Sequence, residues 1–485
     1  MRLLLIAIPL LFFLYFFGLS EVGLLGPDEP RYAAIGREMA RSGDWITPRL
    51  WGERWFEKPA LLYWMTGTAF RLGLGEELAP RLPVALTSVA FLIFFYSLLS
   101  REFGKRAATF ATAILATSAG WLSLSHIGVT DLPMSAAFSA AMLLCLGWIA
   151  RGDRKWMPAA AGFLGVAVLT KGLVPLALVL PLAWMGRRRI LDWLRPSVTG
   201  TFLAIALPWY VLCYLRNGPL FLQKFIWEQH VERFTTAALA HGQPFWFFLP
   251  VIVAALFPWV PVLVLIARRS LYADSRRRFL LLWIIFGLVF FSASRNKLPA
   301  YVLPLVPPLA ALAGIALAEA KRSRWVLVAS AALLVTLPPI AQILPDALAG
   351  GISRATLPPF HWTWLLPALA AVAVWFVDAA GHRIAAVGLL AVAITGAVVS
   401  IELRSFPKID QVASARALWR TVAPIRDRVC IERLHRSLRY GLNYYSVTPL
   451  PDCHTEPREV EITQDAGAAP RLVNAVAVPA SLRTR

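Results

Sequence analysis

The chain is poor in charged residues. Only 16% of its 485 residues are Asp, Glu, Lys or Arg, whereas 58% are hydrophobic. Both values lie well outside the averages of soluble proteins. The scarcity of charge therefore excludes an ordinary soluble protein and indicates a protein that crosses a membrane many times.

Acidic residues are the scarcer of the two charge types. The chain has 28 Asp and Glu against 48 Lys and Arg, a net charge of +20. Such an excess can indicate nucleic-acid binding, but the sequence shows no extended basic face and no nucleic-acid module. The Lys and Arg residues fall instead in short clusters between apolar spans, as the positive-inside bias of cytoplasmic loops predicts.

Motifs that bind nucleotides or zinc are missing as well. No Walker, Rossmann or zinc-ribbon spacing occurs, and the sequence has no strong internal repeat and no low-complexity tract. The energy for a reaction is therefore expected to arrive with the substrate, and a lipid-linked donor would suit a membrane-embedded site. The missing repeat also counts against a transporter or lipid flippase, the alternative from a different class, because transporters commonly show repeated halves.

Apolar segments of membrane-spanning length predict about thirteen transmembrane helices. The first, near residues 3–19, is expected to be an uncleaved anchor because no small-residue cleavage site follows it. Residues 157–185 are flanked by basic clusters on both sides, so two short helices meeting at Lys171-Gly172 are expected there. Single spans are expected near residues 80–100, 107–125, 133–150, 198–215, 245–266, 279–292, 298–317, 325–344, 362–377 and 384–401.

The alternation of basic clusters predicts a cytoplasmic N-terminus. Residues 1–402 are expected to form an all-α transmembrane domain with an external loop over residues 20–79. Residues 403–485 are expected to form a small periplasmic α/β lobe, too short for a large core of its own.

The four cysteines divide between these two regions. Cys145 and Cys213 fall in or at the ends of spans and are expected to be packing residues. Cys430 and Cys453 fall in the lobe, where an oxidising compartment permits a disulfide; two free thiols are the alternative.

Paired acids, basic residues and aromatics concentrate in the first external loop. The string GPDEPRY begins at Gly26, and WFEKP begins at Trp55. Asp28 can cap a helix over residues 29–41, so an interfacial helix with a purely structural Asp28 is one interpretation. A second interfacial helix is expected over residues 59–72.

The loop sequence PDEPRYAAIGREMARSGDWITPRLWGERWFEKPALLYW resembles the first external loop of the ArnT-like, protein-mannosyltransferase-related glycosyltransferases of the GT-C superfamily. The similarity continues through GVTD at residues 128–131, LTKG at 169–172, WEQHVERF at 227–234 and SRNKLPAY at 294–301. At the level of motifs it covers roughly residues 1–310. It implies a GT-C fold and a reaction in which a sugar leaves a polyprenyl phosphate and joins an acceptor hydroxyl or phosphate at the outer membrane face.

Asp28 is the expected catalytic residue, because an inverting transfer needs a base or a charge-stabilising carboxylate near the acceptor. Asp131, in the next external turn, is expected to be a second catalytic carboxylate, with an N-cap of the following span as its structural alternative. Glu29, Arg31 and Tyr32 are expected to support the acceptor.

Cations placed near the donor are expected to stabilise the charge that grows on the lipid phosphate as the glycosidic bond breaks. The candidates are Lys58, Lys171 and Arg233, and the resemblance adds Arg295 and Tyr301 from a loop beside the donor. The alternatives are a surface ion pair for Lys58, snorkelling to the headgroups for Lys171 and plain solvation for the loop.

A divalent metal ion is the one cofactor that the resemblance implies. In the family, a glutamate of the first loop and a histidine of the later external region lie near such an ion, which nominates Glu57 and His230. An ordinary interfacial histidine is the alternative, so metal dependence stays open.

The resemblance implies an inner-membrane enzyme whose active site faces the periplasm. Most concretely, it would move 4-amino-4-deoxy-L-arabinose from undecaprenyl phosphate to lipid A. Another sugar such as mannose, or a protein or other glycolipid acceptor, is the alternative within this class. A catalytically inactive envelope scaffold is a further one.

Overall fold

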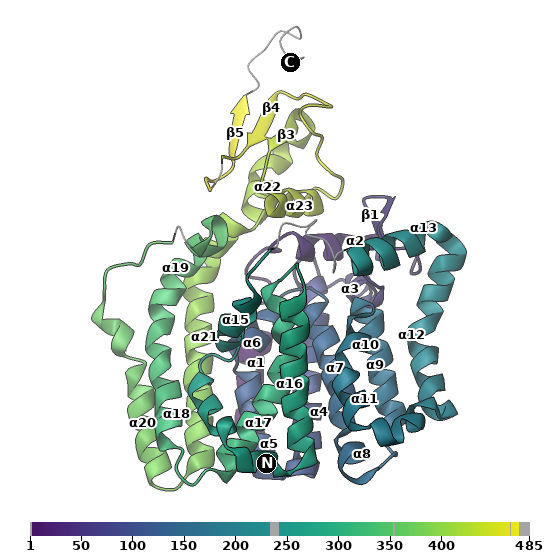
Figure 1. Ribbon diagram of the computed structural model, residues 1–485. Helices are drawn as coiled ribbons and strands as arrows, with labels where there is room; N and C mark the ends of the chain where they lie inside the picture. The colour runs from purple at the N-terminus through teal and green to yellow at the C-terminus, as the bar shows by residue number, and fades with distance from the viewer. Residues whose placement is uncertain (1, 233–241, 353–354, 466, 475–485) are drawn as a thin grey trace.

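The computed structural model describes residues 2–232, 242–352, 355–465 and 467–474, with side chains throughout except at 2–6 and 230–232. It is a bundle of mostly upright helices with a small lobe at one end, as Figure 1 shows. The N-terminus lies at the opposite end of the bundle from the lobe. The all-α architecture of the membrane-spanning part is confirmed.

Seven helical segments in the described part of the chain are long and apolar enough to cross a membrane, and two bent pairs raise the number to nine. The seven are α4 (Leu78–Phe103), α7 with α8 (Asp131–Arg151), α12 (Pro196–Asn217), η6 with α17 (Pro299–Glu319), α18 with α19 (Arg324–Gly350), η9 with α20 (Trp362–Ala379) and α21 (Arg383–Ala413). The bent pairs are α5 (Lys105–Ala116) with α6 (Ala119–Ser125), and Phe245–Ala255, which contains α15, with η4 (Val260–Ala267). The chain is therefore a multi-pass membrane protein.

The remaining expected spans coincide with shorter or more polar helices. They are α1 (Arg2–Tyr15), α9 (Met157–Lys171), α10 (Val174–Leu178) with α11 (Leu180–Met185), and α16 (Ser275–Ala293). α9 ends at Lys171 as expected, and Gly172 follows with φ of 77°, a backbone conformation that favours glycine. The expected break at Lys171-Gly172 is confirmed, whereas the total number of crossings stays a prediction.

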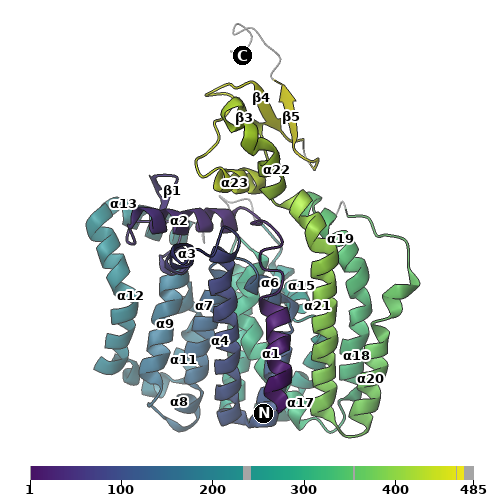
Figure 2. The same cartoon turned by 180° about the vertical axis from the view of Figure 1, so that it is seen from behind.

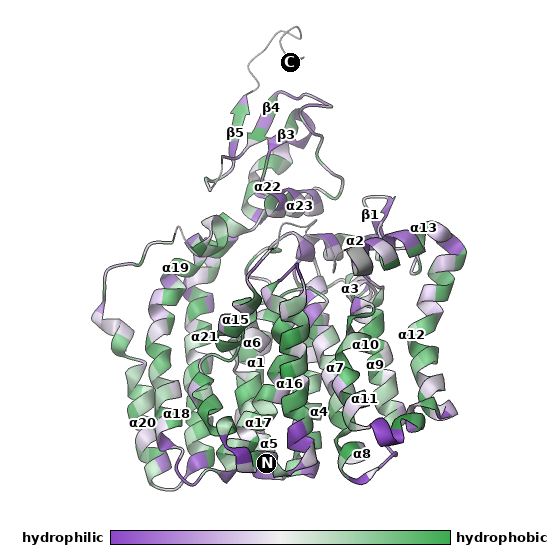
Figure 3. Cartoon of the chain, in the orientation of Figure 1, coloured by the Kyte–Doolittle hydropathy of each residue, from purple (hydrophilic) through white to green (hydrophobic). Residues whose placement is uncertain are grey.

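The hydropathy of the bundle varies along its long axis. Apolar residues cover the middle, and hydrophilic residues gather at both ends and in the lobe (Figure 3). α7 and α17 are almost wholly buried among other helices, whereas α12 and α20 stand at the periphery with many exposed apolar side chains. Peripheral apolar faces of this kind suit contact with lipid tails.

The first external loop folds onto the lobe end of the bundle (Figures 1 and 2). It contains α2 (Asp28–Ser42), a hairpin of β1 (Arg49–Leu50) and β2 (Glu53–Arg54), and α3 (Leu61–Arg71). α2 packs closely on α3 because Gly36 has no side chain: a Cβ there would lie 2.7 Å from Thr66. The two expected helices are confirmed, whereas their position in the membrane interface stays a prediction; the short hairpin is an addition.

The lobe is a small α/β unit, as expected. α21 leads into α22 (Arg416–Val422), β3 (Val429–Arg433), α23 (Arg436–Tyr445), β4 (Val460–Thr463) and β5 (Arg471–Asn474). β4 lies in the centre of the sheet, parallel to β3 and antiparallel to β5. A disulfide joins Cys430 and Cys453, and Cys145 and Cys213 are buried free thiols, so the expected bridge and the expected packing roles are confirmed. The division of the chain at residue 402 stays a prediction.

Specific contacts hold the lobe against the loop. Arg37 of α2 donates to the carbonyl of Tyr444 at 2.6 Å, and its guanidinium lies 4.2 Å from the centre of that ring. The Tyr445 hydroxyl accepts from the backbone N–H of Leu24 at 3.1 Å and donates to Glu77 at 3.2 Å. The lobe is thereby fixed above the motifs of the first loop.

Candidate active site

Motifs that are far apart in the sequence meet at one cavity of about 300 Å³ at the lobe end of the bundle. The first loop contributes two motifs, α7 and α9 contribute the residues at their lobe-facing ends, and η6 closes one side. The polar residues that line the cavity are Asp28, Tyr32, Glu57, Lys58, Thr130, Asp131, Lys171, Gln229, Ser294, Asn296 and Tyr301. Apolar side chains such as Leu124, Met134 and Phe291 form the rest of its wall.

Asp28 presents the most accessible carboxylate of the ion pairs in this cavity. It is the first residue of α2, and 41% of its side chain is exposed. The N-cap position of α2 is Pro27, and the Asp28 carboxylate pairs with Arg31 instead of capping a backbone N–H. The capping interpretation of Asp28 is therefore wrong.

Arg31 connects the two motifs of the first loop. Besides Asp28, its guanidinium binds Glu57 at 2.7 Å and the carbonyl of Pro27 at 2.9 Å, and its side chain is buried. Burial alone would lower the pKa of Arg31, but the Glu57 and Asp28 carboxylates together raise it above its ordinary value. Arg31 thus stays charged and fixes Asp28 relative to Glu57.

Glu57 and Lys58 form a sheltered ion pair and not a surface one. Their charged atoms lie 3.2 Å apart, and only 9% and 13% of the side chains are exposed. The surface interpretation of Lys58 is therefore wrong. The Tyr32 hydroxyl donates to Glu57 at 3.3 Å, and burial and the Glu57 charge raise the pKa of Tyr32 well above its ordinary value, so that Tyr32 remains a neutral donor.

Asp131 and Lys171 form the second carboxylate–cation pair. Lys171 Nζ lies 2.5 Å from Asp131 Oδ1, and 5.1 Å from the centre of the Tyr301 ring. Asp131 begins α7 without capping it, so its structural alternative is also wrong. The pairing removes the cost of an isolated ammonium at the membrane, and Lys171 has no need to snorkel.

Glu29 has a structural position, which corrects the expectation that it supports the acceptor. It is fully buried, and its carboxylate binds Arg81 at 2.7 and 2.9 Å. The same carboxylate accepts the backbone N–H groups of Leu25 and Gly128. Glu29 follows Asp28 on α2, and the rotation of the helix from one residue to the next directs the Glu29 side chain into the protein.

Arg81, the partner of Glu29, was not predicted from the sequence. It donates to Glu29 and to the carbonyls of Leu19, Val22 and Gly23, and so ties the end of the first span to the loop. A signal was present, because Arg81 is a charged residue at the start of an apolar span, where a buried partner is required.

The loop before η6 contributes differently than expected. Tyr301 lines the cavity as predicted, whereas Arg295 is exposed and lies outside the cavity wall. Lys297 is buried and donates to the carbonyls of Ser294 and Gln243. Asn296, from the same motif, lines the cavity instead. The geometry thus gives no support to phosphate binding by Arg295.

The WEQHVERF segment at residues 227–234 is only partly described. Arg233 lies outside the described residues, and the side chain of His230 lies outside the described side chains. Within the described part of the chain, no group of three His, Cys, Asp or Glu side chains converges on a point that could hold a metal ion. Glu57 already pairs with Arg31 and Lys58. The nomination of Glu57 and His230 for a metal ion therefore stays a prediction, and the proposed mechanism uses no metal.

The arrangement provides one accessible carboxylate, a second carboxylate–ammonium pair and the ammonium of Lys58 around a single cavity. Such a set can bind an anionic group with its cations while Asp28 faces a second reactant. The cavity lies at the end of the membrane-spanning helices and not at their middle, where transporters bind their substrates.

Comparisons with known proteins fit this geometry. Residues 57–212 match the family described as dolichyl-phosphate-mannose-protein mannosyltransferase. The undecaprenyl phosphate-alpha-4-amino-4-deoxy-L-arabinose arabinosyl transferase 2 of Pseudomonas fluorescens is 34% identical over 333 residues, 64% of this chain and 56% of that protein. The corresponding transferase of Pseudomonas aeruginosa is 34% identical over 324 residues, 64% of this chain and 58% of that protein. The matches thus span little more than half the length of these relatives.

Solved structures extend the likeness to nearly the whole chain. The apo crystal structure of ArnT from Cupriavidus metallidurans matches with a TM-score of 0.72 and 25% identity, and covers 96% of this chain and 93% of that one. The structure of ArnT from the same organism bound to undecaprenyl phosphate matches with a TM-score of 0.74 and 24% identity, over 98% of each chain. The chain is therefore similar to the ArnT transferases, in sequence over 64% of its length and in fold over nearly all of it.

Proposed function

We propose that this protein is an inverting glycosyltransferase that moves 4-amino-4-deoxy-L-arabinose from undecaprenyl phosphate to lipid A. The observation that carries the proposal is the convergence of Asp28, Lys58, Asp131 and Lys171 on one cavity at the end of the membrane-spanning bundle. The names of the relatives from the two Pseudomonas species support the sugar and its carrier.

The reaction is a single displacement at the anomeric carbon of the sugar. The acceptor oxygen forms the new bond, the bond to the phosphate oxygen breaks, and the lipid phosphate leaves with the bonding electrons. Positive charge develops on the sugar ring at the transition state. The Asp28 carboxylate stabilises this charge and, when the acceptor oxygen is a hydroxyl, takes its proton.

The ammonium groups of Lys58 and Lys171 bind the phosphate of the donor. As the glycosidic bond breaks, negative charge grows on that phosphate, and cations already in place lower the barrier without reorganising. Arg31 and Asp131 position this set: Arg31 holds Asp28 and Glu57, and Asp131 holds Lys171. Tyr301 packs against the Lys171 ammonium.

The test is transfer by the purified protein in proteoliposomes, with the undecaprenyl-phosphate sugar as donor and mass spectrometry as readout. Lipid A is expected to gain the mass of one aminoarabinose unit. Lys58→Ala is expected to raise KM for the donor about 10- to 100-fold, the value of one lost charge-assisted bond. Lys224→Ala is the matched control, because Lys224 pairs with Glu228 on the surface and outside the cavity wall. Unmodified lipid A would contradict the proposal.

The match to the mannosyltransferase family favours a second candidate, transfer of a sugar to a protein. The same assay separates the two acceptors when a peptide mixture is added. A mass increase on peptides, with lipid A unchanged, would select this candidate.

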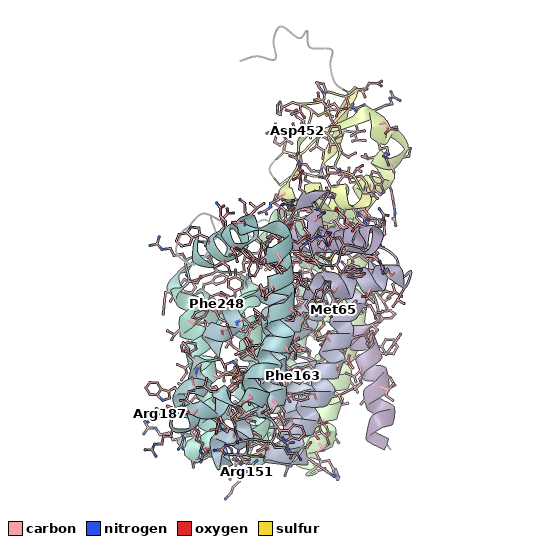
Figure 4. All side chains as sticks on the ribbon, turned by 90° about the vertical axis from the view of Figure 1, so that its right-hand side faces the viewer. Met65, Arg151, Phe163, Arg187, Phe248 and Asp452 are labelled. Carbon is pink, nitrogen blue, oxygen red and sulfur yellow. A yellow bond between two sulfur atoms is a disulfide. The ribbon has the colours of Figure 1, made fainter. Side chains whose placement is uncertain are left out.

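We propose further that the protein lies in the bacterial inner membrane with its lobe in the periplasm. Arg151 and Arg187 project at the end opposite the lobe, and Asp452 lies in the lobe (Figure 4). This distribution follows the positive-inside bias, and the Cys430–Cys453 bridge suits an oxidising compartment. Reporter fusions are expected to be active in the cytoplasm at Ser270 and in the periplasm at Asp452. The reverse pattern would overturn this orientation.

A further inference from the structure

A second cavity, of about 420 Å³, lies beside the first one and has an almost entirely apolar wall. The segment after α1, together with α6, α19 and α21, forms most of this wall. The two cavities share Ile127, and the chain runs from His126 in the second cavity to Asp131 in the first. The second cavity therefore borders the proposed catalytic site.

Polar side chains interrupt the apolar wall at Arg81, Thr117, Ser123, His126 and Glu402, and only the last two of these described side chains leave an atom without a hydrogen-bond partner. Glu402 of α21 has 4% of its side chain exposed, and among the described residues its Oε2 has no hydrogen-bond partner. The same holds for Nε2 of His126. His126 Nε2 lies 3.7 Å from Glu402 Oε1, which is too far for a hydrogen bond.

The other nitrogen of His126 decides what the pair can bind. His126 Nδ1 lies 3.0 Å from the carbonyl of Leu122, so in the neutral ring we assign the proton to Nδ1. Nε2 is then an acceptor that needs a donor. With the Glu402 carboxyl group protonated, a small group within reach of both side chains would donate to Nε2 and accept from Glu402, and so satisfy both.

Such a pair is costly in an apolar cavity unless a ligand completes it. Buried polar groups are nearly always hydrogen-bonded, and ionisable residues within membrane-spanning helices usually mark functional sites. Packing alone would be met by a leucine at position 402. The apolar wall of the cavity suits a hydrocarbon chain, and a hydroxyl group on that chain would complete the pair.

We propose that Glu402 and His126 bind a hydroxyl group carried on an acyl chain of the acceptor lipid. The polyprenyl chain of the donor is a plain hydrocarbon and offers no group to the pair, whereas acyl chains of glycolipids can carry hydroxyl groups. The assignment to the acceptor rests on the proposed function, because the cavity adjoins the site where the acceptor must meet the sugar.

The test compares two neutral probes that differ by one hydroxyl, methyl 3-hydroxymyristate and methyl myristate. Affinities for the purified full-length protein in nanodiscs are measured by competition with a fluorescent fatty-acid ester. The hydroxylated ester is expected to bind about 3- to 10-fold more tightly, the size of one net hydrogen bond. Equal affinities would overturn the proposal and leave water as the partner of the pair.

Substitutions locate the effect. Glu402→Leu is expected to reduce the preference for the hydroxyl to about 1-fold, whereas Glu402→Gln, which can still hydrogen-bond, retains part of it. Ser123→Ala is the matched control, since Ser123 lines the same cavity but donates to the carbonyl of Gly120. If Glu402→Leu does not fold, His126→Phe tests the same contact from the other helix. A preference that survives both substitutions would contradict the assignment to this pair.

The binding test is independent of sugar transfer. Asp28→Asn is expected to keep the hydroxyl preference, because Asp28 does not line the second cavity. If the preference is present and transfer to lipid A is absent, the binding site stands and its assignment to an acceptor falls with the proposed function. If transfer occurs without the preference, only the inference about Glu402 and His126 fails.

Discussion

Asp28→Asn is expected to lower kcat for sugar transfer by about 10²- to 10⁴-fold, the range of a lost general base or charge-stabilising carboxylate. Asparagine has nearly the shape of aspartate and can still accept a hydrogen bond from Arg31, so the cavity keeps its geometry. It has neither the negative charge that stabilises the sugar ring at the transition state nor the capacity to take a proton. The measurement is single-turnover transfer with donor in excess, with thermal unfolding recorded in parallel.

Glu38→Gln is the matched control for this prediction. Glu38 lies on the same helix, accepts the backbone N–H of Gly52 and lies outside the cavity wall. The substitution Glu38→Gln removes one negative charge from α2 at a distance from the reacting atoms, so kcat is expected to change little. An unchanged kcat for Asp28→Asn, with the control also unchanged, would remove Asp28 from the mechanism.

Glu29→Ala is expected to have the opposite signature: a loss of about 3–5 kcal/mol in the free energy of unfolding. The substitution leaves the Arg81 guanidinium buried without its carboxylate, and it also strands the backbone N–H groups of Leu25 and Gly128. Breaking a buried pair by removing one partner is costly because the remaining charge has lost its compensation. The measurement is unfolding of the purified protein by heat and by a denaturing detergent.

The double variant Glu29→Ala with Arg81→Ala separates the pair from its surroundings. If the uncompensated charge causes most of the loss, the double variant is expected to be more stable than Glu29→Ala alone. A Glu29→Ala protein that unfolds like the wild type would show that water or a rearranged loop replaces the carboxylate. That result would contradict the structural role that we assign to Glu29, beside the active-site role of Asp28.

The lobe adds a contact to the active site that no motif indicated. The Arg31 guanidinium lies 5.1 Å from the centre of the Tyr440 ring on α23 and 5.5 Å from that of Trp55. Aromatic faces of this kind favour a cation at such distances. The residue that holds Asp28 and Glu57 is therefore braced by the C-terminal lobe, about four hundred positions further along the chain.

Much of the fold was predictable because membrane spans are determined by local composition. An apolar stretch of sufficient length must satisfy its backbone hydrogen bonds internally, which a helix does. The two helices of the first loop and the break after Lys171 were predictable for a similar reason, since helical periodicity and glycine act over a few residues. The bends after α5 and α15 were not, because they depend on packing against other helices.

The candidate site was likewise predictable in part. The strings around Asp28, Lys58, Asp131 and Lys171 indicated reactive residue types in external positions, and all four residues line one cavity. Arg295 shows the limit of this reasoning, because its motif is present while its side chain lies outside the cavity wall. Whether a loop side chain points into a site depends on the path of the backbone, which local sequence does not determine.

By itself, the sequence determined that the chain is a multi-pass helical membrane protein and which kinds of charged residue its first loop presents. Hydropathy and charge are properties of single residues and short windows, so no tertiary information was needed. Only the tertiary structure decided which charges meet. It paired Lys171 with Asp131, turned Asp28 into the cavity and Glu29 onto Arg81, and brought Glu402 and His126 to within 3.7 Å of each other in the wall of an apolar cavity. The physical reason is that an ion pair or a buried polar group depends on a few ångströms between helices that are distant in the sequence.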